Sequence, residues 1–126
     1  MAPSPASKKI RDFLISAIGL SEGIEIHAAR SSRHSEVGYT SCGDIVLWKG
    51  GGGIGAGHVW FHAEVAGEPI TLIQQLVVHS HDRKAGTAEL HSTESFDILE
   101  TSAIIDSVIW HERAPGVIRA IVPRDL

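Results

Sequence analysis

Apolar residues recur at every second position over much of the chain beyond Gly23, and this period is the strongest constraint on how the sequence can fold. The segments 24–29, 58–66 and 70–79 all carry it. Side chains of a β-strand point alternately to the two faces of a sheet, so this alternation predicts strands with one face in a core. Most of the chain is therefore predicted to form a sheet.

A helical repeat is found only near the start of the chain. Apolar residues follow the i, i+3, i+4, i+7, i+8 spacing of an amphipathic helix at Ile10, Phe13, Leu14, Ala17 and Ile18. We therefore predict an α+β fold, in which one N-terminal amphipathic helix packs on a strongly bent, mainly antiparallel sheet. The sheet is expected to have about five to seven strands and can close as a small barrel.

The length of 126 residues fits a single domain over 1–126, with residues 1–6 as a flexible lead-in. A net charge of −4 disfavours nucleic acid as a partner, because a basic surface supplies most non-specific affinity for phosphates. The longest apolar run, 45–48, is far short of the roughly 20 residues that a membrane span needs, so no membrane partner is expected. With Cys42 as the only cysteine and no signal-peptide pattern, we expect a cytoplasmic protein.

Turn residues predict two hairpins. The first is centred on Gly67 and Glu68, and the second on Pro115 and Gly116, which suit a type II turn and would place Glu112 opposite Arg119. Residues 88–105 fit either a helix or a strand, and the strand is favoured. Residues 30–43 and the glycine run 50–57 are predicted as loops, since glycine weakens regular elements.

The first predicted hairpin defines a histidine-rich sheet face. The strand 58–66 contributes His58, Trp60 and His62 to this face, and the strand 70–79 contributes Gln75 and His79. These five residues are the predicted ligand-binding set. Imidazole, indole and amide side chains together suit a pocket for a small molecule or a peptide segment.

A metal site on this face is the less favoured interpretation, and no cofactor is predicted. Residues rise by about 3.3 Å along a strand, so His58 and His62 lie about 13 Å apart, too far for one ion. His79 and His81 lie about 6 to 7 Å apart and are the weak metal candidates. A third ligand would have to come from elsewhere in the chain.

Two other motifs are weak evidence for a function. The glycine run contains G-x-G-x-x-G, but a strand follows it instead of the helix N-terminus that phosphate binding needs. Cys42 lies in the same predicted loop as His34, yet nothing in the sequence brings the two together. We interpret this cysteine as a small buried apolar residue.

Two functions fit these observations, and the sequence does not decide whether the protein is an enzyme. The preferred hypothesis is a non-enzymatic accessory domain that forms a homodimer and binds a small molecule or a protein partner in the His/Trp-lined pocket. The homodimer is expected because both faces of the C-terminal hairpin are apolar. The alternative is a small metal- or histidine-dependent hydrolase or lyase that uses the same face.

Overall fold

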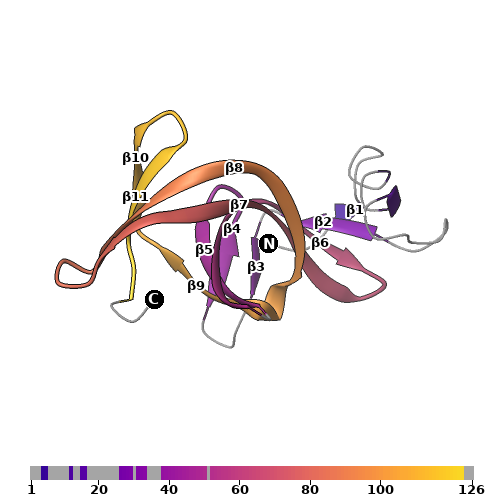
Figure 1. The fold of residues 1–126 in the computed structure, drawn as a ribbon. Coiled ribbons are helices and arrows are strands. Elements are labelled where there is room, and N and C mark those ends of the chain that lie inside the picture. The colour runs from indigo at the N-terminus through magenta and orange to yellow at the C-terminus, as the bar shows by residue number, and fades with distance from the viewer. Residues whose placement is uncertain are drawn as a thin grey trace.

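The computed structural model describes residues 4–5, 12, 15–16, 26–29, 31–33, 38–50 and 52–123. In these residues the chain is nearly all sheet (Figure 1). One antiparallel sheet contains nine strands, and β3 (Ser31–Arg33) and β4 (Tyr39–Ser41) form a second, two-stranded sheet. The predicted antiparallel sheet is confirmed, whereas the α+β class and the strand number of five to seven are wrong.

The N-terminal amphipathic helix is the main error in the predicted fold. The described residues contain no helix of seven or more residues, although most of 10–18 lies outside them. The two larger buried clusters take no described residue from this stretch, and Ile15 is partly buried against a third, smaller cluster of Ile26, Ala63 and Val65. The core is therefore built mainly from the sheet itself.

Three long strands form the centre of the sheet. They are β6 (Gly53–Val65), β7 (Glu68–Asp82) and β8 (Thr87–Glu100), and each pairs with the next. Ala66 and Gly67 form the β6–β7 turn with φ angles of 51° and 84°. The hairpin is therefore where the sequence predicts it, but its turn is one residue earlier, because positive φ at both central positions matches the twist of the strands.

Shorter strands extend the sheet on both sides. Beyond β6 lie β2 (Ile26–Ala29) and β1 (Ser4–Pro5), so part of the predicted lead-in pairs with the sheet. Beyond β8 lie β11 (Val117–Ile121) and then β10 (Trp110–Ala114). Figure 1 shows the β10–β11 hairpin at one end of the long strands and β2 at the other.

Strand pairs and chain connections together form a ring. The first half of β6 pairs with β5 (Ile45–Gly50), and β5 pairs on its other edge with β9 (Ile104–Val108). β9 follows β8 through the short 3₁₀ helix η1 (Thr101–Ala103) and leads through Ile109 into β10. The favoured strand over 88–105 is thus confirmed as far as Glu100.

Buried side chains gather on both sides of this ring. One cluster draws on β5, β6, β7, β8, β11 and the residue after β11, and comprises Ile45, Leu47, Ala56, Leu76, Ala88, Leu90, Ile118, Ala120 and Val122. A second cluster lies on the opposite face of β5 and β6 and comprises Val46, Val59, Ile73, Leu99 and Ile104. Because β5 contributes alternate residues to each cluster, it is apolar from Ile45 to Trp48.

The glycine run was predicted as a loop, but most of it lies within strands. Gly50 ends β5, and residues 53–57 begin β6. A Cβ atom built on Gly55 would lie 2.5 Å from Cε2 of Trp48, and one built on Gly50 would lie 2.5 Å from Cζ3 of the same ring. The two glycines therefore leave the space that the indole occupies. The prediction of a loop over 30–43 is also wrong, because this segment contains β3 and β4.

In the described part of the chain, no helix is long and apolar enough to cross a membrane.

Replacing Gly55 with alanine should destabilise the protein by about 1–3 kcal/mol, because the new methyl group overlaps the rigid Trp48 ring. Urea unfolding followed by tryptophan fluorescence measures this loss. Gly52→Ala is the matched control, since a Cβ there meets nothing within 4 Å, and its effect should stay within about 0.5 kcal/mol. Equal stability of the two variants would refute the proposed packing role of Gly55.

Candidate functional site

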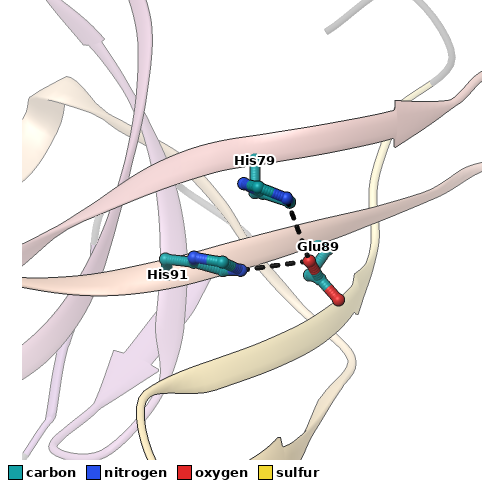
Figure 2. A group of neighbouring side chains, drawn as sticks. All are labelled: His79, Glu89 and His91. Atoms are coloured by element: carbon teal, nitrogen blue, oxygen red, sulfur yellow. Dashed lines mark hydrogen bonds and ion pairs between the residues drawn. The ribbon is translucent and has the colours of Figure 1, made fainter.

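Two histidines and one glutamate meet on the outer face of β7 and β8. His79 comes from β7, and Glu89 and His91 come from β8 (Figure 2). Glu89 and His91 are two residues apart and flank Leu90, which is fully buried in the ring. Alternation along β8 therefore directs Leu90 inward and the two polar side chains outward.

His79 reaches this face through a β-bulge. Val78 lies opposite Leu90, and Ser80 lies opposite Glu89, so His79 is the extra residue between two regular pairs. A bulge places two successive residues against one partner and redirects their side chains. His79 is thereby brought over Glu89 and His91.

The imidazoles of the cluster point at one carboxylate oxygen. Nε2 of His91 donates a hydrogen bond to Oε2 of Glu89 at 3.0 Å, and Nε2 of His79 lies 3.7 Å from the same oxygen. The two rings stack in parallel, with centroids 4.2 Å apart and planes 9° apart. One ligand atom from each of the three residues lies within 4.8 Å of the others. The dashed lines of Figure 2 show both imidazoles converging on the carboxylate.

The second oxygen of Glu89 binds an arginine. Nη1 of Arg113 lies 3.2 Å from Oε1. Arg113 occupies a bulge in β10, where the register shifts between Glu112 and Ala114. This shift also explains why the predicted Glu112–Arg119 pair is wrong: His111 lies opposite Arg119 instead.

These contacts hold the pKa of Glu89 below its ordinary value of 4.5. The hydrogen bond from His91 is the largest cause of the lowered pKa. Desolvation is the next largest effect and opposes it, and the positive charges of His91, His79 and Arg113 lower the pKa further. The carboxylate is therefore ionised at neutral pH. An ionised carboxylate beside two imidazoles is a donor set for a metal ion.

His79 and His81 were the less favoured metal ligands predicted from the sequence, and their side chains do not lie together in the structure. The bulge reverses the alternation of β7, so His81 lies opposite Ala88, which is buried in the ring. Among the described residues, Nε2 of His81 is buried without a hydrogen-bond partner. His79 and His81 therefore point to opposite faces of the sheet.

The predicted ligand-binding set is divided by a second bulge, at Trp60. Val59 lies opposite Ile73 and Phe61 opposite Leu72, so Trp60 is the extra residue. As a result, His58 lies opposite Gln74 whereas His62 lies opposite Thr71, on the other face.

The residues on either side of this bulge have different surroundings. His58 is half-buried, and its ring packs edge-on against Trp110. Trp60 is 53% exposed, packs edge-on against Phe96, and donates a hydrogen bond from Nε1 to Oε1 of Gln74 at 3.2 Å. The tryptophan therefore lies in an aromatic contact at the surface.

His62 is 1% exposed and forms part of a buried chain of hydroxyl groups. Its Nε2 lies 3.0 Å from Oγ1 of Thr40, and its Nδ1 lies 2.7 Å from Oγ1 of Thr71, which in turn contacts Thr101 at 2.9 Å. Hydroxyl groups donate or accept, so both ring nitrogens are satisfied. This chain ties β4, β6, β7 and η1 together and leaves no access for a ligand.

Of the predicted ligand-binding residues, Gln75 and His79 remain on one face of β7. Gln75 is half-buried and donates from Nε2 to Oδ2 of Asp97 at 3.5 Å. The partners of His79, Glu89 and His91, were missed in the sequence. The pattern Glu-Leu-His offered a signal, because a strand that buries the leucine presents the other two side chains together.

Comparisons with protein-family models, with curated proteins and with solved structures found no match to this chain. The function is therefore argued from the site itself.

The titration of Glu89 gives a direct test of the site geometry. A carboxyl group with a lowered pKa in the folded state stabilises the fold above its ordinary pKa, and this contribution is lost as pH falls through the folded-state value. NMR titration of the Glu89 side chain should show a midpoint below 4.5. His91→Ala should raise that midpoint more than Arg113→Gln does, and an unchanged midpoint in His91→Ala would refute the hydrogen bond as the main cause.

Proposed function

We propose that the protein is a small binding domain whose ligand is a divalent transition-metal ion, held by His79, Glu89 and His91. The observation that carries the proposal is the convergence of two imidazole nitrogens on one carboxylate oxygen, at 3.0 and 3.7 Å. Ligand atoms of a tetrahedral zinc ion lie about 3.3 Å apart, given bonds of 2.0–2.2 Å. A metal ion thus fits between these atoms after small side-chain movements.

The hydrogen bond between His91 and Glu89 does not oppose this proposal. A neutral imidazole carries one proton, and His91 binds metal through Nε2 once that proton is on Nδ1 instead. The ion then replaces the proton between Nε2 and the carboxylate. The contact of Arg113 with the other oxygen of Glu89 orients the carboxylate, as partners of metal ligands commonly do.

The donor set favours ions of intermediate softness. Imidazole and carboxylate ligands suit Zn²⁺, Ni²⁺, Cu²⁺ and Fe²⁺, whereas Ca²⁺ and Mg²⁺ prefer oxygen ligands alone. The exposed fraction of the side chain is 59% for His79 and 38% for His91, so a bound ion would face solvent. Three protein ligands leave at least one coordination position open.

This open position is the observation that favours the alternative function, a metal-dependent hydrolase or lyase. Metal-bound water needs a nearby group to accept its proton, and the cluster contains a single carboxylate, which is itself a ligand. The binding domain is therefore preferred over the enzyme. Turnover of p-nitrophenyl esters by the zinc-loaded protein, lost in His79→Ala, would reverse this preference.

We also propose a cytoplasmic homodimer. Cys42 is exposed, so its prediction as a buried residue is wrong, and its free thiol is consistent with a reducing compartment. Support for a second copy comes from the C-terminal hairpin, where Ile109 is 74% exposed and Ile121 is 56% exposed. The backbone of Ile121 donates to the carbonyl of Ile109, so the two exposed residues are neighbours.

Isothermal titration with ZnCl₂ should show one zinc ion per chain. His79→Ala and His91→Ala should each weaken binding by more than about 100-fold, beyond the loss typical of a residue that only orients a ligand. His81→Ala is the matched control and should bind zinc as the unmodified protein does, because its side chain is on the other face. Loss of binding in His81→Ala with retention in His91→Ala would contradict the proposed site.

The homodimer has a separate test. Light scattering after size-exclusion chromatography, without added metal, should give twice the chain mass. Ile109→Ser together with Ile121→Ser should give the mass of one chain, since the apolar contact is removed. A single-chain mass for the unmodified protein would refute the homodimer and would leave the metal site unaffected.

A further inference from the structure

A row of charged and polar residues continues along the sheet from the cluster of His79, Glu89 and His91. Arg119 of β11 lies directly opposite Glu89, and His111 of β10 lies directly opposite Arg119. Directly opposed residues of antiparallel strands point to the same face, so these side chains share the outer face with the cluster. Both Arg119 and His111 are exposed.

The two arginines of this face differ in their partners. Arg113 forms an ion pair with Glu89. Within the ranges that the structure describes, no carboxylate lies within ion-pairing distance of Arg119. Neighbouring strands lie about 4.8 Å apart, so the long side chain of Arg119 starts next to Glu89 with its guanidinium group available.

The charges of the metal-loaded face favour an anion. A divalent ion, two guanidinium groups and one carboxylate leave an excess of positive charge that a dianion neutralises better than a monoanion does. Guanidinium groups bind phosphate through paired hydrogen bonds, and an open metal position accepts one phosphate oxygen. Metal and arginine would therefore bind different oxygens of the same ligand.

We infer that the metal-loaded site binds a phosphate dianion, either free or as a phosphate monoester, and that Arg119 determines this preference. The inference rests on the proposed metal-binding function and adds the class of ligand to it. Glu89 has the central position, because it binds the metal and lies opposite Arg119. His111, directly beyond Arg119, lies on the outer side of the same anion site.

The full-length protein loaded with Co²⁺ provides the test, because its visible absorption reports changes in coordination. Inorganic phosphate and phenyl phosphate should each change the spectrum and saturate, whereas acetate should bind more weakly. If only one of the two phosphates saturates, it identifies the source of the group, and if neither does, the inference is overturned. Protein without metal should bind phosphate at least about tenfold more weakly, since it lacks the inner-sphere bond.

Arg119→Gln should weaken phosphate binding by about 10- to 100-fold, the range expected for a lost charged hydrogen-bond pair. Its affinity for the metal should stay unchanged. Arg83→Gln, in the β7–β8 loop, is the matched control and should leave both affinities unchanged. Equal phosphate affinity in Arg119→Gln and Arg83→Gln would overturn the role of Arg119 and would leave the proposed metal site unaffected. Failure of the unmodified protein to bind metal at all would overturn both proposals.

Discussion

In a long antiparallel ladder, one extra residue on one strand reverses the face that every later side chain occupies. The structure has such shifts at Trp60, at His79 and at Arg113. Each shift changes which residues meet. The shift at His79 places this histidine over Glu89, and the shift at Arg113 accompanies its contact with the other oxygen of the same carboxylate. The geometry of the proposed site therefore depends on backbone register.

The same shifts let one sheet enclose its own core and still present a polar outer face. Leu90 is fully buried in the apolar cluster that β5, β6, β7, β8 and β11 share, while its neighbours Glu89 and His91 point to the opposite face. On the other side of the Trp60 shift, His62 is buried and satisfied by threonine hydroxyl groups from β4 and β7. The sequence predicts His62 and His79 on the same sheet face, but their roles differ. His62 links buried strands, and His79 is available to a ligand.

Local patterns in the sequence predict the strands well and their mutual register poorly. The alternation over 58–66 and 70–79, and the Pro115–Gly116 turn, identify hairpins that the structure contains. The bulges cannot be recognised in this way, because they depend on contacts such as that between Arg113 and Glu89, which are 24 residues apart. The glycine run was misinterpreted for a similar reason: it fits a strand only because the Trp48 ring lies across it. Of the predicted metal pair, His81 lies on the other face of β7, and the residues that lie beside His79 are Glu89 and His91 of the next strand.

X-ray absorption at the zinc edge of the loaded protein tests the central claim most directly, because it counts the ligand atoms by type. Two imidazole nitrogens at 2.0–2.1 Å together with a carboxylate oxygen, and loss of one imidazole in His79→Ala, are the expected result. A sulfur ligand near 2.3 Å, which would implicate Cys42, would contradict the proposed site. A first shell that His79→Ala leaves unchanged would also contradict it.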